Sequence, residues 1–181
     1  MPRTSDPRVV RREGRVVRSP SLQVSLSLWR APEGDEAISS QCVQKLLRAA
    51  GVRQADLSVI LLSGRAMRAL NRKSLGHDYV TDVITFNLGV TANVILRAKP
   101  EGSPRSPLRS ALLEGEIYIC PAEAKRNARL YGEPYARELL RYIAHGILHL
   151  LGHGDDTDAA RSRMRREEDR LLAGIKKETA S

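Results

Sequence analysis

Apolar residues recur along this chain at two spacings, one typical of strands and one typical of helices. From 22 to 29 every second residue is leucine or valine, which predicts a strand with one buried face. Three further apolar runs predict strands, and five segments with apolar residues at helical spacing predict helices. The predicted strands are 22–29, 57–62, 81–88 and 116–120, and the predicted helices are 38–50, 65–75, 122–131, 134–151 and 158–172.

This order of elements predicts an α+β fold, a single domain with a small mixed four-stranded sheet and about five helices. The helix 134–151 is apolar on nearly all sides from Leu139 to Leu151, so we expect it to be buried at the centre of the domain. Pro134 suits its first turn, and Gly152 is the residue expected where such a helix ends.

Composition divides the chain into a domain with less regular segments around it. Residues 1–20 are rich in arginine and proline and predict a disordered basic tail. The domain itself spans 21–175, and 176–181 form a short second tail. Within the domain, prolines and basic residues predict a mobile insertion at 90–113 between two strands.

The chain is strongly basic, with 30 lysines and arginines against 21 acidic residues and a formal charge of +9. This excess favours a polyanionic partner. Aromatic residues make up only 4% of the chain, so we expect phosphate contacts rather than aromatic stacking to dominate RNA affinity.

The sequence predicts a cytoplasmic protein without a membrane partner. No apolar run reaches the length of about 18 residues that a membrane span needs, and the N-terminus lacks the apolar region of a secretory signal. Cys42 and Cys120 have no metal or redox spacing, so we expect buried, reduced thiols.

Two histidines on the predicted central helix indicate a metal site. His145 and His149 are four residues apart, so they share one helical face at roughly 5–6 Å between Cβ atoms. A reversal at Gly152 would bring a third donor toward them. Asp155 is the favoured third ligand, with His153 and Asp156 as alternatives. Three protein ligands leave one position open, which is typical of catalytic zinc rather than structural zinc.

The residue after the first histidine separates this helix from the zinc-protease pattern. That pattern, His-Glu-x-x-His, uses its glutamate as general base, whereas this chain has Gly146 there. The difference argues against peptide hydrolysis by the usual route and toward chemistry that needs mainly Lewis-acid assistance.

Four blocks of the sequence, in the same order, resemble those of one known protein family. The block His145-Gly-x-Leu-His149-Leu-x-Gly152 resembles the signature of the YbeY family, metal-dependent endoribonucleases that act in ribosomal RNA maturation. Asn71 to Phe86, with Thr81-Asp82-Val83, resembles a second family segment, and Gly115-Glu116-Ile117-x-Ile119 resembles a third. Met164-Arg165-x-x-Glu168 resembles the C-terminal helix of the family. The match spans roughly residues 22 to 172.

The resemblance implies a single-strand-specific, metal-dependent endoribonuclease that matures the 3′ end of 16S ribosomal RNA and acts in ribosome quality control. It implies one Zn²⁺ per chain on His145, His149 and Asp155. The implied partners are single-stranded ribosomal RNA and the small ribosomal subunit or its proteins. Asp155 stands where the commonest family pattern has a histidine, and Leu75 stands where the family usually has an arginine.

The expected catalytic residues are His145 and His149 through the metal, with His77 and Asp78 as candidates for a proton donor or base. His77 and Asp78 are equally well explained as polar residues of a surface loop. Asp82 and Glu116 are expected to orient metal-bound groups or to serve a structural role. Two alternative functions are a zinc peptidase and a ribosome-associated assembly factor with a structural zinc.

Overall fold

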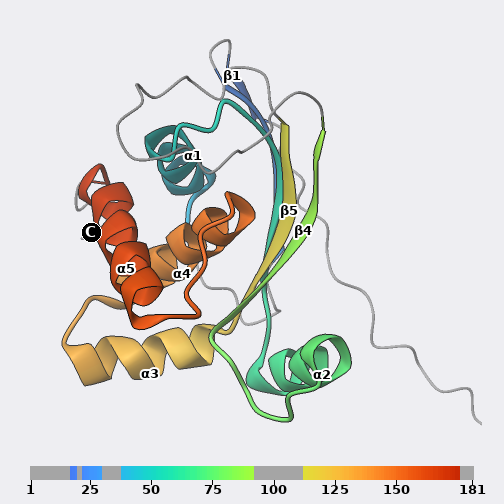
Figure 1. Ribbon diagram of the computed structural model, residues 1–181, viewed down its shortest axis with the longest axis vertical. Helices are drawn as coiled ribbons and strands as arrows, with labels where there is room; N and C mark the ends of the chain where they lie inside the picture. The colour runs from blue at the N-terminus through green and yellow to red at the C-terminus, as the bar shows by residue number, and fades with distance from the viewer. Residues whose placement is uncertain (1–16, 20–21, 30–37, 92–111, 176–181) are drawn as a thin grey trace, which may run out of the picture.

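The computed structural model describes residues 17–19, 22–29, 38–91 and 112–175, and in this part of the chain one mixed sheet is packed against helices (Figure 1). The strands are β1 (Val17–Ser19), β2 (Leu22–Trp29), β3 (Gln54–Leu61), β4 (Val83–Thr91) and β5 (Leu112–Ile119). The helices are α1 (Ser40–Ala49), α2 (Gly64–Leu75), α3 (Pro121–Tyr131), α4 (Tyr135–Leu150) and α5 (Asp158–Ala173).

The strand order across the sheet is β1-β2-β3-β5-β4. The inner strands β2, β3 and β5 run parallel, and β1 and β4 pair antiparallel at the two edges. The α+β class, the mixed sheet and five helices are therefore confirmed for the described residues. The prediction of four strands is wrong, because the described sheet has five strands and includes β1.

The missed strand β1 has three residues, too few to show an alternating pattern, and it belongs to the segment predicted as a disordered tail. The rest of that segment, residues 1–16 and 20, lies outside the described residues, as do 176–181. At the predicted insertion 90–113, β4 extends to Thr91 and β5 begins at Leu112, and 92–111 lie outside the described residues.

The helix α4 lies at the centre of the described domain, as predicted. Ten of its 16 residues are buried, and it packs against β5, β4, α1, α3 and α5. Two glycines allow its close approach to β5. A Cβ added at Gly146 would lie 2.8 Å from Ile117 Cδ1, and one added at Gly115 would lie 2.6 Å from Leu150 Cδ2. Helix and strand are therefore in direct van der Waals contact.

A second, smaller apolar cluster lies under α2. Its buried residues are Met67 from α2, Ile84 from β4 and Cys120, with Phe86 and Tyr118 packed against them. The helix ends at Gly76, whose φ of 75° is a left-handed conformation that favours glycine. The cluster thereby fixes α2 and the loop that follows it beside the start of β4 (Figure 1).

Two expectations about the whole chain can be compared with the described residues. Cys42 and Cys120 are free and buried, as expected. Among the helices that the structure describes, none combines the length and apolar character needed to cross a membrane.

Candidate metal centre

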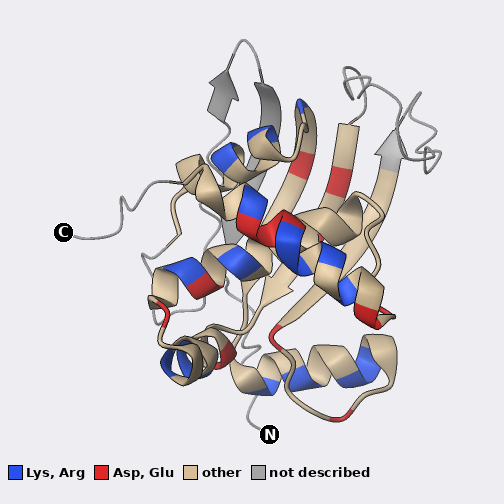
Figure 2. Ribbon diagram, turned by 60° about the vertical axis from the view of Figure 1, so that its left-hand side comes forward, with Lys and Arg blue, Asp and Glu red and all other residues tan. Residues whose placement is uncertain are grey.

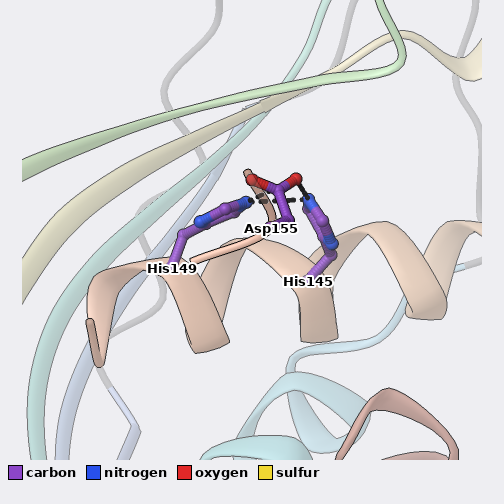
Figure 3. Close-up of side chains that lie close together, drawn as sticks. All are labelled: His145, His149 and Asp155. Atoms are coloured by element: carbon purple, nitrogen blue, oxygen red, sulfur yellow. Dashed lines mark hydrogen bonds and ion pairs between the residues drawn. The ribbon is translucent and has the colours of Figure 1, made fainter. Parts of the chain in front are cut away.

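His145 and His149 project from the same side of α4, one turn apart (Figure 3). Their Nε2 atoms are 2.9 Å apart, and their rings meet edge to face with centroids separated by 4.4 Å. Both nitrogens are therefore directed at the same small volume. The helical spacing of four residues gives this arrangement, as the sequence predicts.

A tight turn after α4 brings a carboxylate to the two histidines. Gly152 has a φ of 87°, and the amide of His153 donates to the carbonyl of Leu148, which closes the end of the helix. The chain then reverses, and Asp155 Oδ2 lies 3.8 Å from His145 Nε2 and 3.6 Å from His149 Nε2.

The three side chains of His145, His149 and Asp155 could hold a metal ion. Their ligand atoms all lie within 4.8 Å of one another, and no other group of three such donors is found among the described residues. Ligands bound tetrahedrally at about 2.0–2.2 Å would be roughly 3.3 Å apart, close to the separations observed. The two alternative donors, His153 and Asp156, are exposed and do not belong to this group.

Glu168 of α5 fixes the orientation of His145. Its Oε1 accepts a hydrogen bond from His145 Nδ1 at 2.9 Å, and its Oε2 accepts one from Arg141 Nη1 at 3.3 Å. With its proton on Nδ1, His145 presents an unprotonated Nε2 to the site. This is the usual way in which a carboxylate prepares a histidine for a metal.

Arg141 is the cation that pairs with Glu168. It also donates to Asp169 at 2.8 Å and lies 3.8 Å from Glu138. Burial lowers the pKa of Arg141, but its hydrogen bonds to Asp169 and Glu168 outweigh this effect and raise it above its usual value. A charged network therefore links α4 to α5 directly behind the site.

The site is open to solvent on one side. The side chain of Asp155 is 47% exposed, against 22% for His145 and 29% for His149. Burial and the neighbouring His145 lower the pKa of His149. Its imidazole is thereby held in the neutral form, which is the form that binds metals.

Arg161 holds the loop that carries Asp155. Its guanidinium donates to the carbonyls of Asp155 and Asp156 at 3.0 and 3.3 Å, and to the Asp158 carboxylate at 2.5 Å. The loop between α4 and α5 is thus attached to the first turn of α5.

The contacts of Glu168 were missed at the sequence level, where Asp82 and Glu116 were the expected orienting carboxylates. Asp82 instead accepts from the Val83 amide at 2.9 Å, and Glu116 accepts from the Tyr118 hydroxyl at 2.8 Å. One feature of the sequence could have indicated Glu168, namely its place on the apolar face of α5. Glu168 shares that face with the buried residues Met164 and Leu171, where a carboxylate without a partner would be costly.

His77 and Asp78 lie in the exposed loop after α2, outside the group of donors. Asp78 accepts two hydrogen bonds from Arg68, at 2.9 and 2.8 Å, and Arg68 lowers its pKa. The His77 ring stacks on that of Tyr79. A catalytic role for either residue stays a prediction, and these contacts do not support it. Leu75, at the end of α2, is 52% exposed.

This fold and site define an α+β protein with a candidate metal centre of three donors. A buried helix presents two histidines to a partly exposed position, and one carboxylate from a following loop joins them. Such three-donor sites leave room for water or substrate at the ion.

Comparisons with known proteins narrow this class to one family. The family model described as Endoribonuclease YbeY matches residues 30–176. An Endoribonuclease YbeY of Chlorobium phaeovibrioides is 36% identical over 137 residues, which are 76% of this chain and 80% of the relative. One of Moorella thermoacetica is 35% identical over 147 residues, covering 80% of this chain and 90% of the relative. The chain belongs to the YbeY endoribonuclease family.

A solved structure agrees with the fold. The solution structure of TM1509 from Thermotoga maritima aligns with a TM-score of 0.50 at 24% identity, covering 83% of this chain and 89% of that protein. At this identity the likeness concerns the fold alone.

Proposed function

We propose that this protein is a metal-dependent endoribonuclease that cuts single-stranded RNA during ribosomal RNA maturation. The observation that carries the proposal is the convergence of His145, His149 and Asp155 in a chain whose relatives are named endoribonucleases. The 3′ end of 16S ribosomal RNA, the small ribosomal subunit as partner and a cytoplasmic location belong to the same proposal.

The ion we propose is zinc, one per chain, because imidazole nitrogens and carboxylate oxygens are among its usual ligands. His145 and His149 would hold the ion through Nε2, and Asp155 would hold it through a carboxylate oxygen. A bound zinc ion would supply a Lewis acid for the charge that develops on the scissile phosphate. Glu168 and Arg141 keep His145 in the required tautomer, and Arg161 holds the Asp155 loop in place.

The packing of Gly146 disfavours the peptidase alternative. A Cβ at this position would lie 2.8 Å from two carbon atoms of Ile117, so the position points into the sheet. A glutamate cannot be accommodated there without displacing β5. The helix therefore lacks both the general base of the zinc peptidases and the space for one.

Solvent exposure disfavours the alternative of a purely structural zinc. Structural sites are closed by four protein ligands. Here three donors come together among the described residues, and the carboxylate among them is about half exposed. An ion in this position would have a coordination site accessible to a phosphate group.

The test is cleavage of a labelled single-stranded ribosomal RNA fragment by the wild-type protein and by His149→Ala, with bound metal quantified in both. The proposal expects the wild type to cut and to carry about one zinc per chain, and the variant to lose both. Cleavage that persists in metal-stripped protein would contradict it. A wild type that binds RNA and zinc without cutting would favour the assembly factor instead.

His153→Ala is the matched control, because this histidine is exposed and lies outside the donor group. We expect it to retain zinc and activity. Loss of zinc in His153→Ala but not in an Asp155→Ala protein would instead assign the third ligand to His153.

A further inference from the structure

The loop that follows α2 carries two exposed aromatic rings that the metal centre does not use. We infer that His77 and Tyr79 form a stacking subsite for one unpaired base of a single-stranded RNA. The inference rests on the proposed function for the nature of the ligand. The subsite itself is argued from the contacts of the loop.

The two rings stack on each other at the protein boundary, which leaves the outer face of each ring for a further stacking partner. They are stacked with centroids 5.4 Å apart and planes inclined by 15°, and the Tyr79 hydroxyl lies 3.4 Å from His77 Nδ1. Tyr79 is 56% exposed, and His77 is exposed as well. Proteins that bind single-stranded RNA stack unpaired bases on tyrosine and histidine rings presented in this way.

The loop is held in place from both sides. The side chain of Asn71 is buried, and its Nδ2 donates to the Tyr79 carbonyl at 3.0 Å. The carboxylate of Asp78, between the two aromatic residues, accepts two hydrogen bonds from Arg68. An incoming base would therefore meet rings on an ordered backbone, and binding would cost little further ordering.

The charges around the rings suit a polyanion. All charged residues of α2 are basic (Figure 2). All four are exposed: Arg65, Arg68, Arg72 and Lys73. Asp78 offsets part of this charge through Arg68, while Arg72 is 69% exposed and 3.9 Å from the same carboxylate. A nucleotide whose base stacks on the rings would have arginine side chains near its phosphates, which matches the requirements of single-strand binding.

This subsite would add one stacking contact to the phosphate contacts that composition leads us to expect as the dominant source of RNA affinity. The low aromatic content is real, but two rings suffice when a loop brings them together. Gly76 permits the turn out of α2, and the residues that follow it, 77 and 79, are then placed on the same side of the loop.

The experiment compares two labelled strands of about eight units by fluorescence anisotropy, using the full chain in EDTA so that neither strand is cut. One strand is oligoadenylate, and the other is an abasic strand with the same number of phosphates. We expect Tyr79→Ala to weaken oligoadenylate binding by about fivefold or more and to leave abasic binding unchanged. Tyr79→Phe keeps the ring and should bind within about twofold of the wild type.

Tyr131→Ala is the matched control, because Tyr131 is an equally exposed tyrosine at the end of α3. It should bind both strands as the wild type does. His77→Ala provides a second variant and should show a smaller loss on oligoadenylate. Circular dichroism checks the fold of every variant.

Three results would overturn the subsite. They are unchanged oligoadenylate binding by Tyr79→Ala, an equal loss by Tyr131→Ala, or an equal loss on the abasic strand, which would mean that phosphate contacts alone had changed. Displacement of oligoadenylate by polyglutamate with the same dependence on Tyr79 would instead indicate an acidic protein partner. Cleavage is measured separately, so a wild type that binds through Tyr79 without cutting contradicts the proposed function and leaves the subsite intact.

Discussion

Glu168 is the single residue on which the presentation of His145 depends. It is 6% exposed, accepts from the histidine through one oxygen and accepts from Arg141 through the other. Both oxygens of this side chain therefore serve as acceptors, which the single oxygen of an amide could not do. Arg141 stabilises the buried Glu168 carboxylate, so the orientation of the His145 imidazole depends on a network of His145, Glu168 and Arg141.

Replacing Glu168 by glutamine should therefore weaken zinc binding while the protein still folds. The amide has one acceptor oxygen, so its NH₂ group would face either a histidine N–H or a guanidinium N–H. We expect zinc affinity to fall by about 10- to 100-fold, measured by competition with a chromophoric chelator. Glu167→Gln is the control, because Glu167 pairs with Arg170 on the same helix. Equal affinities of the two variants would refute the role of Glu168.

Gly115 is the residue that sets the distance between β5 and α4. A methyl group there would lie 2.6 Å from Leu150 Cδ2 and 3.1 Å from the Phe86 carbonyl oxygen, and Leu150 is fully buried. We expect Gly115→Ala to lower the free energy of unfolding by about 1–3 kcal/mol, measured by urea denaturation. At Gly64 the nearest atoms are 3.8 Å away, so Gly64→Ala should have no such cost.

At the scale of secondary-structure elements, the site is a unit of α4, the following loop and α5. Helix α4 contributes both histidines, and the loop contributes Asp155. Helix α5 contributes Glu168, which holds His145, and Arg161, which holds the loop. The contacts between α4 and α5 are therefore functional as well as structural. We therefore expect a change in the packing of α5 to alter metal binding first.

Arg161→Ala tests this coupling, because it removes the bonds from α5 to the loop carbonyls without touching any proposed ligand. We expect zinc affinity to fall by about three- to tenfold, the effect of losing roughly one hydrogen bond of ordinary strength. The measurement is the same chelator competition. Arg163→Ala alters an exposed arginine of the same helix and should bind zinc normally. Equal zinc affinities of the Arg161→Ala and Arg163→Ala proteins would mean that the loop does not depend on the contact with Arg161.

At the scale of the whole molecule, the metal centre lies on the most buried helix of the described domain. An ion that binds the folded protein and not the unfolded chain stabilises the fold by mass action. Because the donors come from α4 and from the loop to α5, the ion would connect the centre of the core to the helix that covers it.

Addition of zinc to metal-stripped protein should accordingly raise the melting temperature. With free zinc at about 100 times its dissociation constant we expect a gain of about 2.7 kcal/mol, or roughly 5–10 °C for a chain of this size. Thermal unfolding followed by circular dichroism measures the shift. The His149→Ala protein should show almost none of it, and a similar shift in that variant would mean that zinc binds elsewhere.

Much of this architecture could be predicted from local patterns, because the helices and strands have clear periodicity. The spacing of His145 and His149 made two of the three donors predictable, and the reversal at Gly152 favoured Asp155. The strand β1 could not be predicted, because three residues carry no period. The partnership of His145 with Glu168 joins residues 23 positions apart, and local spacing gives no information about it.

The stacked pair of His77 and Tyr79 was missed for a related reason. Composition counts aromatic residues over the whole chain, whereas a stack depends on how one loop is folded. The bidentate contact between Arg68 and Asp78, ten residues apart, holds that loop and has no signature in the sequence.

The contact between Gly146 and Ile117 also bears on how this fold could acquire a new activity. A designer who wished to convert the helix to peptide hydrolysis would begin with Gly146→Glu, but that single change would push the helix away from the sheet. A smaller residue at 117 would be needed at the same time, on a strand almost 30 positions earlier in the chain. Positions 146 and 117 would therefore have to change together, because a chain with Gly146→Glu alone would be poorly packed.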